Sequence, residues 1–249
     1  MAARQLWRVM VSTCAALLSG AVLAGLALSA ETPGTTAFPK TIVGPGGQTL
    51  EAVEIKLPRP LFQGTPKHIK PAPTLEKYTE APRPPFYAVA GVTNIALNKK
   101  VTSSDMEPIV GELSMATDGD KEGADGSFVE LGPGLQWLQI DLGKESEIHG
   151  LGVWHFHAEG RVYHDVVVQA SNDPEFQRDV VTIFNNDFDN SSKLGAGKDL
   201  EYIEDYRGKL IDARDKQGNP VKARYVRLYS KGNTSNDMNH YVEVEVYGK

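Results

Sequence analysis

Hydrophobic and polar positions alternate with a period of two along the C-terminal part of the chain. In residues 137–143 the apolar side chains fall on one face and the polar side chains on the other, which predicts a half-buried strand that Gly143 and Lys144 end. Residues 242–247 alternate strictly between valine and Glu or Tyr. This pattern predicts a closing strand with one buried face.

Further strand-like runs follow one another at short spacing, divided by clusters of Gly, Asn, Asp and Ser. They occupy residues 94–104, 147–157, 163–171, 180–184 and 225–229. Residues 147–157 carry apolar side chains on both faces and are expected to form a central, buried strand. The spacing as a whole predicts an all-β fold, an antiparallel β-sandwich. The long polar stretch 185–218 has mixed spacing, and its structure stays open.

Residues 31–92 have a different composition, because they hold eleven of the fifteen prolines. This excludes long helices and central strands and favours an irregular, extended arm. Alternation over residues 53–57 predicts one short strand, and residues 75–80 one or two helical turns. Two interpretations remain open. The segment is either a spacer or an arm that lies over the sandwich, which its apolar side chains at positions 61, 62, 78, 86 and 87 favour.

Residues 1–30 have the pattern of a targeting segment: basic Arg4 and Arg8, an apolar run over residues 9–28, and small residues at the end. This predicts a secretory signal peptide cleaved near Ser29 or Ala30. The alternative is an uncleaved membrane anchor. Either interpretation places the remainder outside the cytoplasm, as a secreted, periplasmic or cell-surface protein. The expected parts are therefore residues 1–30, the proline-rich 31–92 and the sandwich 93–249.

Charge and motifs exclude several function classes. The formal net charge is -6, and no stripe of Lys and Arg is present, so nucleic acid is not expected as a partner. No GxSxG elbow, phosphate-binding glycine loop or HExxH motif occurs. The one cysteine, Cys14, lies in the N-terminal apolar run, so a processed chain has no thiol nucleophile and no disulfide. We therefore do not expect an enzyme.

Six segments in a fixed order resemble the discoidin family, also called coagulation factor V/VIII type C domains. They are residues 94–98, 116–120, 137–143, 170–173, 223–228 and 243–248. The resemblance covers about residues 93–249 and implies a galactose-binding-like jelly roll. Family members bind glycans, lipid headgroups or proteins through variable loops on this scaffold.

The resemblance also implies a structural calcium ion. Many bacterial members, grouped among carbohydrate-binding modules, hold Ca²⁺ with a loop that matches Asp118 and Asp120 and with a glutamate that matches Glu243. Carboxylate and carbonyl oxygens are the ligands that Ca²⁺ prefers. This chain departs from the pattern by an insertion over residues 122–128, in which Asp125 or Ser127 could substitute. The alternative is that the two aspartates cap a turn and Glu243 faces solvent.

In members that bind sugar, an aromatic or histidine platform and Arg, Asn and Glu side chains line loops at one end of the sandwich. Two loops here supply such groups, residues 154–161 and 232–240, and four of the six histidines lie in or beside them. The expected ligand-binding residues are His155, His157, Glu159, Arg161, Asn236, Asn239 and His240. Alternatively, the polar residues of these loops are ordinary turn residues, and His155 pairs at a strand end.

Two further metal hypotheses are weaker. His155 and His157 would point to one side of a strand, as a transition-metal site needs, but a third ligand such as His164 or His240 is required. The loop 185–192 begins like a calcium loop, yet it lacks the later bidentate glutamate, so a solvated loop is favoured.

These observations give one main hypothesis and one alternative. The main hypothesis is a non-catalytic extracytoplasmic module that binds carbohydrate through its loops and holds a structural Ca²⁺. The alternative is a scaffolding subunit of a cell-envelope assembly that binds a protein partner through the proline-rich arm and the sandwich surface. Contact with a membrane is expected only through an uncleaved N-terminal segment.

Overall fold

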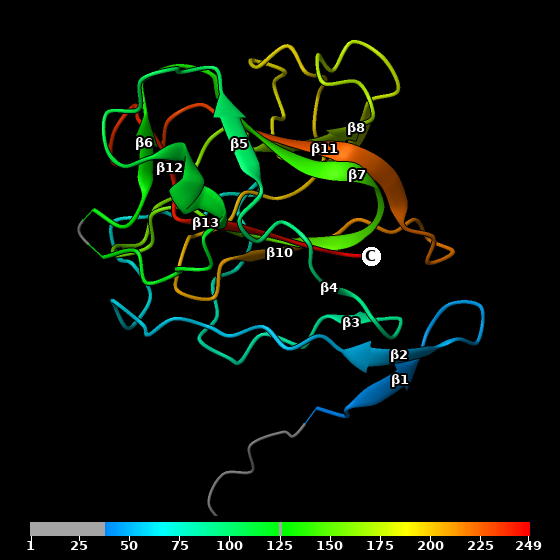
Figure 1. Cartoon of the computed structure of the whole chain (residues 1–249). Helices are drawn as coiled ribbons and strands as arrows, with labels where there is room; N and C mark the ends of the chain where they lie inside the picture. The colour runs from blue at the N-terminus through cyan, green and yellow to red at the C-terminus, as the bar shows by residue number, and fades with distance from the viewer. Residues whose placement is uncertain (1–37, 125) are drawn as a thin grey trace, which may run out of the picture. The chain divides into compact units, whose positions relative to one another are not determined.

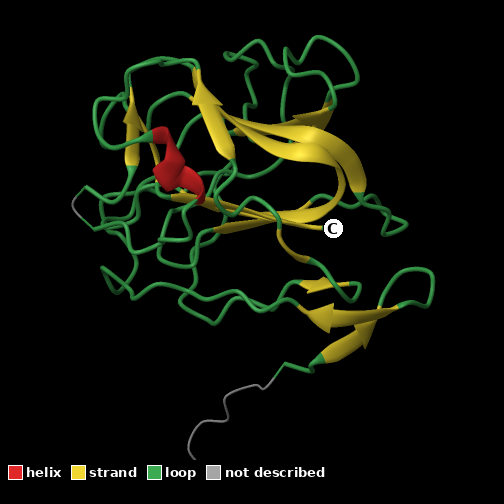
Figure 2. Cartoon of the chain, in the orientation of Figure 1, coloured by secondary structure: helices red, strands yellow, loops and turns green. Residues whose placement is uncertain are grey.

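The computed structural model describes residues 38–124 and 126–249, which contain thirteen strands and one short 3-10 helix (Figures 1 and 2). The elements in chain order are β1 (Thr41–Val43), β2 (Thr49–Ala52), β3 (Tyr87–Ala88), β4 (Thr93–Asn94), β5 (Lys100–Ser103), η1 (Leu113–Thr117), β6 (Val129–Leu131), β7 (Gln136–Trp154), β8 (Val167–Ser171), β9 (Val181–Asn185), β10 (Lys209–Asp212), β11 (Val221–Ser230), β12 (Asn239–Tyr241) and β13 (Glu243–Gly248). The predicted segment 1–30 lies outside the described residues.

The strands form one large antiparallel sheet and two small ones. The large sheet has the order β4-β13-β7-β11-β8-β9, and β5 and β10 also pair with β7. The small sheets are β1-β2-β3 and β12-β6. This nearly all-β arrangement confirms the antiparallel sandwich of the galactose-binding-like jelly roll.

Strand β7 belongs to both layers of the sandwich, because its two halves have different partners. Residues before the bend pair with β5, residues after it pair with β10 and β13, and β11 pairs with both halves. Figure 1 shows β7 and β11 curving together through this bend. The prediction that Gly143 ends the strand is therefore wrong. Gly143 adopts a φ of 88°, which glycine reaches without steric cost, so the chain turns and pairing continues.

The main core lies between the two layers. Leu138 and Ile140 of β7, Val226 and Leu228 of β11, and Val244 of β13 are among its fully buried residues. The alternation that predicted these strands also identified their inward faces correctly. The structure thus confirms the central role expected for β7.

Strand β13 is buried on both faces, so the prediction of a one-sided closing strand is wrong. Its inward valines enter the main core. On the other face, Tyr247 packs against Phe86 of the proline-rich segment, with ring centroids 5.7 Å apart. Val53, Ile55 and Ala88 complete this second cluster. A period of two shows which residues share a face, but it does not show what covers that face.

Residues 38–249 form one compact unit, in which residues 38–92 lie along the sandwich, as the second interpretation of this segment describes. Its short strands are β1, β2 and β3, none of which covers residues 53–57, and residues 75–80 form no helical turn. Leu75 instead pairs with Glu201 as an isolated bridge. Within the stretch left open, residues 209–212 form β10, which pairs with β7. In the described part of the chain, no helix has the length and hydropathy needed to span a membrane.

Candidate functional site

The two loops singled out in the sequence meet at one end of the sandwich. Backbone hydrogen bonds join them: His164 N–H donates to the Gly232 carbonyl, and Thr234 N–H donates to the Val162 carbonyl. The start of the loop 186–200 joins the same group, because Asn186 N–H donates to Val166. The sequence therefore identified segments that the fold brings together.

The histidines of these loops are interior side chains with protein partners. His155 is fully buried, its Nδ1 lies 2.6 Å from Glu204 Oε1, and its ring stacks on Tyr163. His157 is also fully buried, and its Nε2 donates to the Lys121 carbonyl at 2.8 Å. The two rings have different protein partners, each of which engages one ring nitrogen. The described residues therefore give no support to the His155–His157 metal hypothesis.

His240 is held between Tyr163 and Glu130. The Tyr163 hydroxyl donates to Nδ1 at 2.9 Å, and Nε2 lies 3.2 Å from Glu130 Oε2. Burial, with Arg161 and His155 nearby, lowers the pKa of His240 to about 3. The ring is therefore neutral near neutral pH.

Arg161 and Asn239 are buried as well. Arg161 donates to Glu159 Oε1 at 2.7 Å, and its guanidinium lies over the Phe156 ring. Asn239 donates to the Gly132 and Gly134 carbonyls and accepts from Gly232 N–H. It therefore connects neighbouring loops and does not present its amide to solvent.

The expectation of an exposed polyol pocket built from these residues needs correction. Five of the seven residues, His155, His157, Arg161, Asn239 and His240, are buried. The partners of the three histidines come from segments distant in the sequence, which the fold packs against both loops, whereas Arg161 donates to Glu159 of its own loop. Glu159 and Asn236 are exposed and remain candidates for ligand contact.

The residues expected to bind calcium have mixed surroundings. Asp118 accepts from Asp120 N–H, and Asp120 accepts from Glu122 N–H, as in the turn alternative. Glu243, however, is fully buried and does not face solvent. Its Oε2 accepts from Gly119 N–H at 3.2 Å, and its Oε1 has no hydrogen-bond partner among the described residues. Asp125 lies outside the described residues.

A buried carboxylate oxygen without a partner is a suitable ligand for a cation. Burial, together with the nearby charges of Glu245 and Asp118, raises the pKa of Glu243 to about 9. Among the described residues, Asp118, Asp120 and Glu243 do not form a close group of three carboxylates, so this site would need backbone carbonyls to complete the shell of a Ca²⁺ ion.

One such group does occur among the described residues. Asp165, Asp187 and Asp189 place carboxylate oxygens within 4.8 Å of one another. Hydrogen bonds from Ser191 and Ser192 already engage these carboxylates, and Lys231 Nζ lies 3.5 Å from Asp165. The group therefore holds the loop 185–192 in place. The sequence pattern indicated this loop but not Asp165, which lies some twenty positions earlier.

Beside this group lies a hollow of about 460 Å³, here named the loop hollow. It is lined by Thr74, His164, Asp165, Asn186, Phe188, Asp189, Ser191, Glu201 and Lys231. A second hollow of about 320 Å³ adjoins it and shares His164 and Glu201, whose side chains lie 3.3 Å apart. The arm contributes to both hollows, through Thr74 and through residues 68–75.

The loop hollow combines one apolar ring with several polar groups. Phe188 is 42% exposed. Asn186 is buried, its Oδ1 accepts from Val166 N–H at 2.7 Å, and its Nδ2 has no partner. These groups suit a ligand with an apolar face and several hydroxyl groups. The sequence pattern had pointed to His164 and to the loop 185–192, but not to Thr74, Asp165, Glu201 or Lys231, which come from other segments of the chain.

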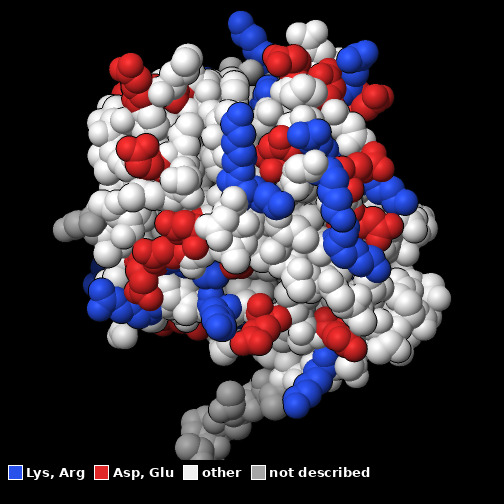
Figure 3. Space-filling view, viewed as in Figure 1, with Lys and Arg blue, Asp and Glu red and all other residues white. Residues whose placement is uncertain are grey.

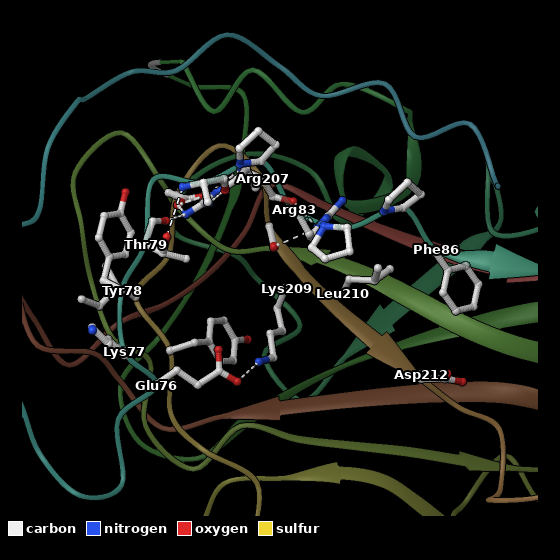
Figure 4. A pocket seen from close by; sticks show the side chains of 18 residues that line it. Glu76, Lys77, Tyr78, Thr79, Arg83, Phe86, Arg207, Lys209, Leu210 and Asp212 are labelled. Carbon is white, nitrogen blue, oxygen red and sulfur yellow. Dashed lines mark hydrogen bonds and ion pairs between the residues drawn. The ribbon is translucent and has the colours of Figure 1, made fainter. Parts of the chain in front are cut away.

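A third hollow, also of about 460 Å³, lies between residues 76–86 of the arm and residues 202–212. Figure 4 shows Arg83 and Arg207 along one edge, with Glu76 and Lys209 across from them. No sequence signal pointed to it, since its walls come from two segments that were left without predicted contacts. We name it the arm hollow.

Comparison with known proteins gives one family match. The model of the F5/8 type C domain matches residues 100–244. None of the curated proteins compared with the chain matches it.

Solved structures similar to the chain include three modules. Chitosan-binding module 1 derived from a chitosanase/glucanase of Paenibacillus sp. IK-5 shares 23% identity over 63% of this chain and 99% of its own, with a TM-score of 0.42. The fucose binding module SpX-3 of Streptococcus pneumoniae shares 19% over 62% and 97%, with a TM-score of 0.40. A fucolectin from striped bass (Morone saxatilis) serum shares 19% over 64% and 49%, with a TM-score of 0.42.

Proposed function

The chain belongs to the F5/8 type C domain family, and from this premise we propose that it is a non-catalytic module that binds carbohydrate at the loop hollow. The observation that carries the proposal is the combination of the exposed Phe188 ring with the Asn186 Nδ2, which has no partner among the described residues, and the Asp165 and Asp189 carboxylates. A pyranose ring has an apolar face for the aromatic ring and hydroxyls for the polar groups.

The position of the hollow supports the same proposal. It lies among the loops that follow β9 and β11 and precede β8, where side chains can vary without disturbing the core. The adjoining hollow extends the surface past His164 and Glu201. A ligand longer than one sugar residue could therefore occupy both, with the exposed Glu159 and Asn236 as further candidates for contact.

The proposal includes a structural Ca²⁺ held by Glu243 and Asp118, with Asp120 and Asp125 as further ligands. The ion would supply a positive charge to the buried Glu243 carboxylate, whose Oε1 has no partner in the described part of the chain. It would thereby fix the loop after η1 to the start of β13. The proposed setting outside the cytoplasm rests on the sequence pattern of residues 1–30.

The alternative function, a scaffold that captures a protein partner through the arm, has less support. Phe86 and Ala88 of the arm are buried against the sandwich, so these apolar side chains are already in use within the chain. Figure 3 shows acidic and basic side chains interspersed on the face in view, where no patch of one sign marks a charged partner.

The test is a glycan array followed by calorimetry with the glycans that bind. We expect Phe188→Ala to weaken binding by about tenfold, as expected for loss of one aromatic contact. Phe38→Ala is the matched control, because Phe38 is 41% exposed and Phe188 is 42% exposed. Absence of any bound glycan, or equal affinity in both variants, would contradict the proposal.

A further inference from the structure

The arm hollow is a further candidate site with its own chemistry. Its walls are Pro82, Pro84 and Pro85 of the arm, with the Tyr78 and Phe86 rings at opposite flanks. Its volume of about 460 Å³ falls in the range of small-molecule sites. It is separate from the loop hollow, since the two share no lining residue.

Most charges in the arm hollow are paired within the chain. Glu76 pairs with Lys209, and Asp205 pairs with Arg207. Arg207 also donates to the Thr79 and Ala81 carbonyls, so its guanidinium is fully engaged. Asp212 pairs with Arg214, outside the hollow.

Of the remaining charges in the hollow, Lys77 is exposed, whereas Arg83 is half-buried. Its Nη1 donates to the carbonyls of Arg207 and Gly208, but Nε and Nη2 have no hydrogen-bond partner, and no carboxylate of the described residues lies within 4.0 Å. Burial and the neighbouring Arg207 lower the pKa of Arg83, which shows that its surroundings disfavour an uncompensated positive charge. An anionic group placed here would offset this cost.

A second group in the hollow lacks a partner. Tyr202 is 6% exposed, and its hydroxyl has no hydrogen bond within the described part of the chain. A buried hydroxyl is ordinarily bonded. Arg83 comes from the arm and Tyr202 from the sandwich, so a ligand that bonded to both would connect the two segments.

We propose that the arm hollow binds a small organic carboxylate, such as a uronic acid, through Arg83 and Tyr202. The free guanidinium nitrogens donate to the carboxylate, and the Tyr202 hydroxyl bonds to the ligand while the proline and tyrosine walls cover its apolar part. A bound ligand stabilises the arm on the sandwich, because it contacts both.

The experiment is calorimetry on the full chain with D-glucuronate, with D-glucose as its neutral counterpart and acetate as a carboxylate without a sugar ring. We expect glucuronate to bind and glucose not to bind. Binding of acetate at the same site would identify the carboxylate alone as the recognised group, whereas binding of glucuronate only would show that the sugar ring is recognised too. Failure of both carboxylates to bind, or equal binding of glucose, would overturn the proposal.

Variants assign the binding to the hollow. Arg83→Gln should weaken glucuronate binding by at least about tenfold, whereas Arg178→Gln, at an arginine whose side chain is 81% exposed, should not. Tyr202→Phe removes a hydroxyl that has no partner, so it should keep the thermal midpoint and weaken binding about threefold to tenfold.

If Arg83→Gln does not fold, Tyr202→Phe decides, and unchanged binding in that folded variant would refute the site. Phe188→Ala should leave glucuronate binding intact. A failure of the loop hollow is therefore distinguishable from a failure of the arm hollow.

Discussion

Glu243 is the buried carboxylate on which the calcium proposal depends. We expect excess Ca²⁺ to raise the melting temperature of the chain by several degrees, because a ligand at 100 times its dissociation constant adds about 2.7 kcal/mol. Glu243→Gln should abolish this shift. In chelator near neutral pH the variant should melt close to the unsubstituted chain, because the raised pKa of about 9 already keeps the metal-free Glu243 carboxyl neutral.

The control for this experiment is Glu175→Gln, at an exposed glutamate. It should retain the full response to Ca²⁺. An identical Ca²⁺ response in Glu243→Gln and the unsubstituted chain would remove Glu243 from the proposed site.

The lowered pKa of His240 predicts how the stability of the chain depends on pH. Burial lowers its pKa in the folded state from 6.5 to about 3, so the unfolded chain binds the proton more readily. The contribution of neutral His240 to stability is therefore present above pH 6.5 and is lost as the pH falls from 6.5 toward 3.

Urea unfolding at several pH values measures this effect. His240→Gln should reduce the slope of unfolding free energy against pH by up to about 1.4 kcal/mol per pH unit within this window. His68→Gln, at an exposed histidine, is the control and should keep the slope. An unchanged slope in His240→Gln would show that His240 is not the group responsible.

At the scale of single residues, the sequence predicted which loops lie close together better than it predicted which side chains are exposed. It placed His155, His157 and His240 in loops that do meet, because loop positions follow from the strands that flank them. It did not show that these side chains are interior, because Glu204, Lys121 and Glu130, which pack against them, lie far away in the sequence. Glu243 was assigned through the family resemblance, whereas its burial could be seen only in three dimensions.

At the scale of elements, Phe86 attaches the arm to the sandwich. It is 5% exposed and contacts Tyr247 of β13, while Gly150 of β7 leaves the space that its ring occupies: a Cβ at Gly150 would lie 2.6 Å from Phe86 Cζ. The arm therefore docks where two neighbouring strands of the large sheet accept one aromatic ring.

We expect Phe86→Ala to lower the free energy of unfolding by about 3–5 kcal/mol, as for other buried Phe→Ala changes. It should also speed cleavage within the arm during limited proteolysis. The control is Phe38→Ala, at an exposed phenylalanine in the same segment. It should change the free energy of unfolding by no more than about 0.5 kcal/mol and should leave the rate of cleavage within the arm unchanged. Equal protease sensitivity of the two variants would show that Phe86 does not hold the arm.

The same elements show how far periodicity alone can predict a fold. The alternation in residues 137–143 and 242–247 identified strands and inward faces correctly, because a one-residue shift would place every valine of β13 on the wrong side. It could not locate the bend of β7, because a glycine often ends a strand, whereas Gly143 only turns this one. Proline content excluded long elements in the arm, yet its docking depended on a tertiary contact that no local pattern encodes.

At the scale of the whole molecule, the arm is part of both proposed sites. Thr74 lines the loop hollow and Arg83 lines the arm hollow. On the outer face of the sandwich, Tyr247 and Leu210 pack against arm residues. Removal of the arm would expose this apolar surface, at a cost of about 1.5–3 kcal/mol for each large side chain that loses its cover.

We therefore expect a chain of residues 93–249 to be less stable to urea than one of residues 38–249 and to self-associate in light scattering. Glycan binding at the loop hollow should weaken, because Thr74 and the bridge between Leu75 and Glu201 are lost, and glucuronate binding should disappear with Arg83. A shorter chain that is monomeric, equally stable and fully able to bind would show that the arm is only a spacer. Loss of stability with retained glycan affinity would instead limit the arm to covering the sheet and place the sugar site on the sandwich loops alone.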